Sequence, residues 1–272
     1  MPTHEAELAG WVAAAINDKP TFQERAKQAA AQLDATQIKK LVKYFIYPNN
    51  PPKPAEVENQ YSRLGEWQSM SQWAIFEIFY NRPDDTLPII RDIAFGEYDW
   101  TQMSAIHTLC RLANEGKIER EKTIDEIIAF LPQMRDTASE YTINTLSLFV
   151  PTSPRIVELI TGLIDEGLEW EPDVNLITSL ARIAPEAART YRQPLYDVMN
   201  GKYESKPDQP ASYNQLQAAI TLSLLYPEDQ TPIKFIAHWA AHHPNDERRG
   251  FIRLAIDETP HLKKFFNETK DI

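Results

Sequence analysis

The sequence predicts an all-α protein built from stacked antiparallel helix pairs, and three observations support this. Glycine accounts for only 8 of 272 residues, less than half its usual share of about 7%. Helices avoid glycine in their interiors because it costs roughly 1 kcal/mol relative to alanine. Helical periodicity with start and stop signals recurs along the chain. Alternation with period two, which marks a half-buried strand, is nowhere sustained.

The start and stop signals divide the chain into short amphipathic segments. Ser153-Pro154 and Thr231-Pro232 mark helix starts, because proline at the first helical position gives up no hydrogen bond. Left-handed C-terminal caps are expected at four glycines: Gly96, Gly116, Gly167 and Gly201. We therefore expect helices near residues 4–17, 21–33, 36–46, 56–80 (with a break near 65–69), 84–95, 101–115, 120–132, 137–149, 154–166, 172–184, 187–200, 211–226, 231–243, 246–257 and 260–268.

An apolar triplet at positions i, i+3 and i+6 recurs in the second helix of each expected pair. The central residues of the four triplets are Leu109, Leu146, Leu180 and Leu222, at intervals of 37, 34 and 42 residues. The polar, proline-bearing segment 202–213 lengthens the last interval. One helix pair cannot bury its apolar faces, but a stack of pairs can. The repeat therefore predicts units of helix, short turn and helix that stack in order along the chain.

These repeats resemble the HEAT and armadillo-like superfamily of α-solenoids over roughly residues 84–257. The resemblance implies a right-handed superhelix whose second helices line a concave binding surface. A further resemblance is to the small acidic HEAT-like immunity proteins of bacterial toxin systems, which act by docking on a toxin. An ordinary helical bundle is the alternative fold.

A proline-rich stretch near the N-terminus interrupts the helical pattern. Four prolines fall within the nine residues 47–55, which excludes a helix there and favours a stiff, extended connection. We therefore expect an N-terminal helical cap over 1–47, a connection over 48–55 and HEAT-like repeats over 56–272, with the cap and repeats forming one continuous domain.

The net charge of −11 is concentrated in the middle of the chain. Residues 51–200 carry 13 basic and 24 acidic side chains, whereas the two flanking segments are within one charge of neutral. Such a field repels phosphate backbones and anionic lipid and speeds encounter with basic proteins. We therefore expect a basic protein partner and no nucleic acid or membrane ligand. A general solubility charge is the simpler interpretation.

We also expect neither an export signal nor a membrane span in this chain. Its N-terminus has acids where a secretory signal needs basic residues. No apolar run approaches the roughly 18 residues of a membrane span. Cytoplasmic localisation is therefore expected.

Two sets of residues are candidates for partner binding. The first consists of acidic and aromatic side chains at two expected turns, where a tryptophan supplies buried area and the acids select a basic partner. Its members are Asp99, Trp100, Asp165, Glu166, Glu169, Trp170 and Glu171. The simpler interpretation is that each tryptophan packs on its own helix pair while the acids are solvated.

The second set lies on the polar side of the second helices. Aligning the triplets places His107, Asn144 and Thr178 at equivalent positions, and Arg111 and Arg182 four residues after the first and third of them. Such a row suits a groove for an extended partner. An unspecialised solvated face is the alternative interpretation.

Motifs with catalytic chemistry are missing from the sequence. We find no glycine-rich phosphate loop, no HExxH and no CxxC. The single cysteine, Cys110, lies in an apolar stretch and is expected to be buried. His238 and His242 have metal-ligand spacing, but a helix C-terminus favours histidines for electrostatic reasons alone. We therefore expect no metal and no cofactor.

The function expected from these features is that of a non-catalytic protein-binding module, such as an adaptor, scaffold or immunity-type protein. Two alternatives remain open. One is an enzyme with an unrecognised site in the groove, and the other is a structural subunit of a homo-oligomer.

Overall fold

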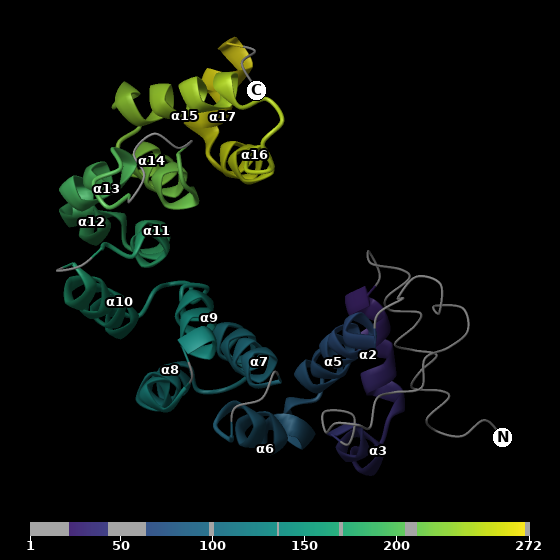
Figure 1. Ribbon diagram of the computed structural model, residues 1–272. Helices are drawn as coiled ribbons and strands as arrows, with labels where there is room; N and C mark the ends of the chain where they lie inside the picture. Colours follow the sequence, from purple (N-terminus) through teal and green to yellow (C-terminus); the bar gives the residue numbers. More distant parts are fainter. Residues whose placement is uncertain are drawn as a thin grey trace. The chain divides into compact units, whose positions relative to one another are not determined.

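A computed structural model describes residues 22–42, 64–97, 101–134, 136–168, 171–204 and 211–269. Every regular element in these ranges is a helix and none is a strand, which confirms the all-α prediction. The chain divides into two compact units, Met1–Phe149 and Val150–Ile272 (Figure 1). The expected helix at 4–17 and the proline-rich connection at 48–55 lie outside the described residues. Within the described residues, no helix is both long enough and apolar enough to cross a membrane.

In the first unit, α5, α7 and α9 pack side by side in order along the chain. Helix α2 packs on α5, while α6 packs against both α5 and α7, and α8 packs on α7. The elements of this unit are α2 (Phe22–Gln32), α3 (Ala35–Lys40), α5 (Leu64–Tyr80), α6 (Pro83–Ala94), α7 (Gln102–Asn114), α8 (Arg120–Phe130), the 3-10 helix η3 (Leu131–Gln133) and α9 (Asp136–Leu146).

In the second unit, α11 and α14 pack side by side, with α10 on α11 and both α13 and α15 on α14. A hydrogen bond of 2.7 Å between the hydroxyls of Thr178 and Thr221 joins α11 to α14. The elements are α10 (Pro154–Gly167), α11 (Val174–Ile183), α12 (Pro185–Ala188), the 3-10 helix η4 (Arg189–Tyr191), α13 (Arg192–Met199), α14 (Tyr213–Leu225), α15 (Gln230–His242), α16 (Arg249–Glu258) and α17 (Pro260–Thr269).

The apolar triplets form the centre of each unit. Eleven of their twelve residues are buried, and Ile183 is partly exposed. Within each unit, the second helices that carry the triplets are neighbours: α7 packs on α9, and α11 packs on α14. This arrangement explains why the triplets must be apolar, because the helices that carry them pack on one another within each unit.

The predicted break in α5 and two of the four predicted glycine caps are not found in the structure. The break predicted near 65–69 is wrong, because α5 begins at Leu64 and Gly65 falls in its first turn, so the helix runs on unbroken. Left-handed caps form at Gly116 and Gly201 but not at the other two glycines. Gly167 is the last residue of α10, and Gly96 is needed instead for close approach, since a Cβ there would lie 2.5 Å from the Asp92 carbonyl oxygen.

Candidate functional site

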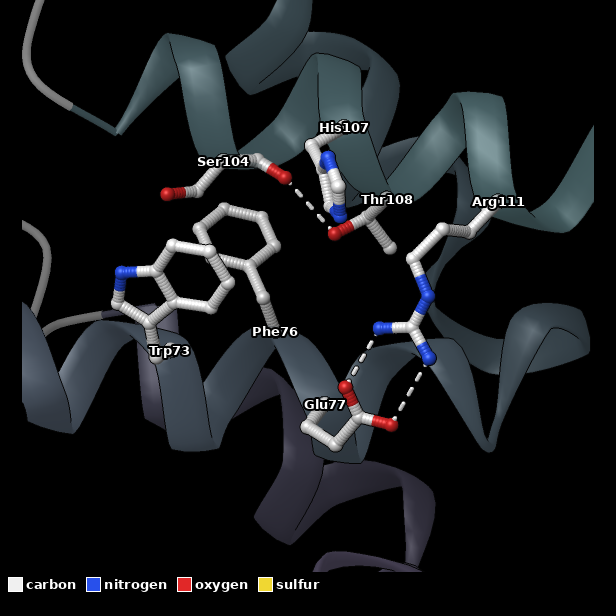
Figure 2. Close-up of a pocket in the computed structure, with 7 residues that line it drawn as sticks. All are labelled: Trp73, Phe76, Glu77, Ser104, His107, Thr108 and Arg111. Carbon is white, nitrogen blue, oxygen red and sulfur yellow. Dashed lines mark hydrogen bonds and ion pairs between the residues drawn. The ribbon is translucent and has the colours of Figure 1, made fainter. Parts of the chain in front are cut away.

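A shallow pocket lies between α5 and α7 in the first unit (Figure 2). Trp73 and Glu77 enter it from α5, one helical turn apart. His107 and Arg111 enter it from α7 with the same spacing. The remaining lining residues are Phe76, Ser104 and Thr108. The structure thus places two residues of the predicted groove, His107 and Arg111, in one site with two residues that the sequence interpretation did not select.

A bidentate ion pair forms one wall of the pocket. Arg111 donates from Nη1 to Glu77 Oε2 at 2.6 Å and from Nη2 to Oε1 at 3.1 Å. The Glu77 side chain is only 8% exposed and that of Arg111 is 28% exposed. Burial alone would lower the pKa of Arg111, but the hydrogen bonds and charge of Glu77 raise it above its usual value. The pair therefore fixes the orientation of the guanidinium.

The Tyr80 ring braces this ion pair from α5. The Arg111 guanidinium lies over the ring at 3.9 Å from its centroid, and Lys117 Nζ lies 3.8 Å from the same centroid. Lys117 reaches this position because α7 ends in a Schellman cap. There the Gly116 and Lys117 amides donate to the carbonyl oxygens of Ala113 and Leu112 at 3.1 and 2.9 Å.

The opposite wall is formed by Trp73 and His107. The Trp73 side chain is 46% exposed, which is unusual for so large an apolar group. Its ring centroid lies 6.1 Å from that of His107. Burial lowers the pKa of His107, as does the nearby Arg111 charge, although Glu77 opposes them. The imidazole is therefore neutral at pH 7 and keeps a nitrogen that can accept a hydrogen bond.

Several polar atoms that line the pocket make no hydrogen bond to the described residues. Within the described part of the chain, neither the His107 ring nitrogens nor the Ser104 hydroxyl has a hydrogen-bond partner, whereas Thr108 donates to the Ser104 carbonyl at 2.8 Å. The enclosed space is only about 10 Å³, about what one water molecule needs and far below the roughly 300–1,000 Å³ of sites for small molecules. The pocket is therefore a shallow depression that a partner could cover but that no side chain could enter.

The other predicted groove residues lie elsewhere. Asn144 is exposed on α9 of the same unit, and Arg182 is exposed on α11 of the second unit. Thr178 is only 7% exposed. Its hydroxyl donates to the Val174 carbonyl at 2.7 Å and accepts from Gln217 at 2.9 Å. Thr178 therefore serves the packing of α11 on α14.

The acidic turns are described only in part. Asp99, Trp100, Glu169 and Trp170 lie outside the described residues. Asp165, Glu166 and Glu171 are exposed. Asp165 accepts a hydrogen bond of 2.8 Å from the Tyr191 hydroxyl, and Glu171 accepts one of 3.3 Å from Asn214. Asp165 thus links α10 to η4, and Glu171, in the loop before α11, contacts α14.

A repeat signal could have located Trp73 and Glu77. They precede His107 and Arg111 by 34 residues each, an interval found between the repeats. The same shift maps the triplet of α7 onto Gln72, Ile75 and Ile78, all of which are buried. Because glutamine occupies the first position, α5 did not qualify as a triplet helix.

Two other candidate groups have structural explanations. The centroids of the His238 and His242 rings lie 4.1 Å apart with the ring planes tilted by 38°, and His242 Nδ1 lies 2.7 Å from the His238 carbonyl oxygen. Within the described ranges, no three potential ligands gather into a metal site. Cys110 is buried, and burial raises the pKa of its thiol to about 12. The thiolate needed for nucleophilic attack is therefore not populated at neutral pH.

The chain was also compared with known proteins. No model of a known protein family matches it, and no curated protein or solved structure is significantly similar to it.

Proposed function

We propose that this chain is a non-catalytic protein-binding module, acting as an adaptor, scaffold or immunity-type protein. In this proposal its HEAT-like helix pairs stack as a right-handed α-solenoid, and the partner docks on the face that contains the α5–α7 pocket. The side-by-side order of α5, α7 and α9, and of α11 and α14, supports the stacking within each unit.

The observation that carries the proposal is the half-exposed Trp73 at the edge of a braced pocket. Tryptophan is among the residues most enriched in interface hot spots, where a few large side chains carry most of the binding energy. Roughly half of its surface remains available for burial by a partner. Because the Glu77–Arg111 pair and the Tyr80 ring already fix the neighbouring groups, little conformational entropy is lost on binding.

The chemistry of the pocket favours recognition over catalysis. Glu77 is the one carboxylate in its lining, and both of its oxygens accept hydrogen bonds from Arg111. A carboxylate whose two oxygens are both engaged by one guanidinium is held in a fixed position. The geometry therefore supports a bracing role for Glu77.

The expected partner is a basic protein, encountered in the cytoplasm. Counted over the sequence, Met1–Phe149 carries 15 basic and 21 acidic residues, a net charge of −6. A surface with this charge attracts a basic protein over a distance of about 8 Å at physiological salt and disfavours phosphate backbones and anionic membranes. We therefore propose a protein ligand rather than a nucleic acid or a lipid.

Affinity capture with matched baits tests this function. Immobilised wild-type chain, Trp73→Ala and Leu254→Ala are each exposed to a lysate of the native host, and retained proteins are quantified by mass spectrometry. Leu254 is an exposed apolar residue on α16 of the second unit and serves as the control. We expect a basic protein that the wild type and Leu254→Ala retain equally and that Trp73→Ala loses. Equal retention by all three baits, or retention of only further copies of this chain, would contradict the proposal.

A further inference from the structure

We propose that His238 and His242, at the C-terminal end of α15, form a two-histidine chelate for a late first-row divalent cation such as Zn²⁺. The two histidines lie four residues apart on α15, and both are exposed. The site belongs to the second unit. The inference therefore goes beyond the proposed function and stands or falls independently of the α5–α7 face.

The separation of the two imidazole rings suits a shared cation. Residues four apart on a helix lie one above the other on the same face, and here the ring centroids are 4.1 Å apart. Two imidazole nitrogens that bind one cation at about 2.0 Å, with a right or a tetrahedral angle at the metal, hold their ring centroids about 4.5–5.1 Å apart. The rings therefore need to separate by about 1 Å or less. Because both side chains are exposed, rotation about their side-chain bonds can supply this change.

A hydrogen bond to the helix backbone leaves one nitrogen of His242 suited to a metal. Nδ1 of this ring lies 2.7 Å from the His238 carbonyl oxygen. Because a carbonyl oxygen can only accept, Nδ1 carries the hydrogen, and Nε2 of the neutral ring keeps the free lone pair. Metal-binding histidines commonly donate their other ring N–H to a backbone carbonyl in this way, which fixes the tautomer and raises the basicity of the ligating nitrogen. His242 therefore already makes the supporting hydrogen bond that is typical of a metal ligand.

The electrostatics of this helix end favour a cation. α15 ends at His242, so the carbonyl groups of its last turn carry a partial negative charge. Two cationic side chains of the neighbourhood act against a metal ion. Lys234, one turn earlier on the same face, is exposed, and its flexible chain can turn into solvent. Arg249 donates to the carbonyl oxygen of Ala240, which is two residues from each histidine and therefore on the opposite face of the helix.

The pair forms an open site, because two ligands are fewer than the three or four that zinc sites in proteins usually have. Within the described ranges, no third histidine, cysteine or carboxylate joins the two rings. Water, or a ligand from another molecule, completes the coordination shell. The expectation of no metal took the helix C-terminus as sufficient reason for these histidines. The ring separation and the bond to the His238 carbonyl, which only the structure shows, lead to a different inference.

Nuclear magnetic resonance with Zn²⁺ as the probe tests this inference on the full-length chain. The histidine rings are labelled with ¹⁵N, and the signals are assigned by their loss in His238→Gln, His242→Gln and His243→Gln. We expect Zn²⁺ to shift the Nε2 signals of His238 and His242 together and saturably, and Mg²⁺, which prefers oxygen ligands, to shift neither. His238→Gln and His242→Gln should each weaken Zn²⁺ binding at the remaining ring at least about tenfold, because the chelate is lost.

His243→Gln is the matched control. The His243 ring lies against Trp239 with a centroid distance of 5.2 Å, and it takes no part in the proposed chelate. This variant should therefore bind Zn²⁺ within about twofold of wild type, because both ligating rings remain.

Several results would overturn the chelate. Zn²⁺ that shifts only one of the two rings, that shifts every histidine ring in parallel, or that shifts none would each reject it. Equal affinity in wild type, His238→Gln and His242→Gln, or loss of binding in His243→Gln, would reject it as well. Both ligating side chains are exposed, so the glutamine variants should fold as wild type does, which circular dichroism checks. None of these outcomes bears on partner capture by Trp73→Ala, so the two proposals fail separately.

Discussion

Arg111 is the residue whose partners most constrain the pocket, because it holds Glu77 in a bidentate pair and stacks on Tyr80. Replacing Arg111 by methionine leaves the 8%-exposed carboxylate of Glu77 without its counter-charge. Breaking a fully buried pair costs about 3–5 kcal/mol. Since Arg111 is itself partly exposed, we expect a loss of about 2 kcal/mol in the free energy of unfolding.

A double-mutant cycle in urea measures this loss. Glu77→Leu combined with Arg111→Met should recover the free energy of unfolding to within about 1 kcal/mol of wild type, because no buried charge remains. Lys263→Met is the control, since its pair with Asp257 is exposed and should change the transition little. Additive losses in the double variant would contradict this account of the pair.

His107 should make the stability of the first unit depend on pH. Burial and the Arg111 charge lower its pKa from the usual 6.5, so the folded state takes up its proton less readily than the unfolded state. The effect is absent above about pH 6.5, and stability falls as the pH drops below that value. Between about pH 7 and about pH 5, the urea midpoint of wild type should therefore fall further than that of His107→Gln. Equal falls would show that His107 titrates normally.

At the scale of single elements, replacing two glycines by alanine should change stability in opposite directions, although both have open space around them. Gly162 lies inside α10, and a Cβ there would have nothing within 4 Å. Gly116 also has open space but adopts φ +69 in the cap of α7. Gly162→Ala should stabilise by about 0.5–1 kcal/mol through helix propensity, and Gly116→Ala should destabilise by about 1 kcal/mol because alanine disfavours this conformation. Urea denaturation of both variants checks the signs, and stabilisation by Gly116→Ala would contradict the cap geometry.

Asp229 caps the N-terminus of α15 by accepting a hydrogen bond of 3.0 Å from the Thr231 amide. Hydrogen bonds from the Tyr196 hydroxyl, the Thr231 amide and Arg192 lower its pKa from 3.8 to about 2. The ionised form therefore contributes stability above about pH 3.8 that is lost as the pH falls towards 2. Asp229→Ala should cost about 1–2 kcal/mol at neutral pH, and the neighbouring exposed Glu228→Ala should cost little. Thermal unfolding of the two variants at about pH 7 and about pH 2 should show their difference shrinking in acid; an unchanged difference would refute this role.

The helices could be predicted from the sequence because its strongest signals are local. Low glycine content and the periodic triplets predicted helices whose bounds mostly agree with the structure to within a few residues. The pocket could be predicted only in part, because it depends on contacts between side chains that are 34 residues apart in the sequence. His107 and Arg111 were selected by their place in the repeat. Trp73 was not selected, because the polar Gln72 occupies the first position of the triplet in α5 and the repeat was therefore not recognised there.

At the scale of the whole molecule, the two compact units share the negative charge almost equally. The first carries −6 and the second −5. Charge therefore does not single out one unit as the docking region. Among the tryptophan side chains that the structure describes, Trp73 of the first unit is half exposed and Trp239 of the second unit is buried. The proposed binding of a protein through the α5–α7 face therefore centres on Trp73.

The most direct test of that claim is the dissociation constant of the captured partner for wild type, Trp73→Ala and Leu254→Ala, measured by surface plasmon resonance. Truncating a hot-spot residue costs on the order of 2 kcal/mol, or about 30-fold in affinity. We predict a loss of about that size for Trp73→Ala, arising mainly from faster dissociation. Leu254→Ala should stay within about threefold of wild type. Equal dissociation constants for all three proteins would contradict binding through this face.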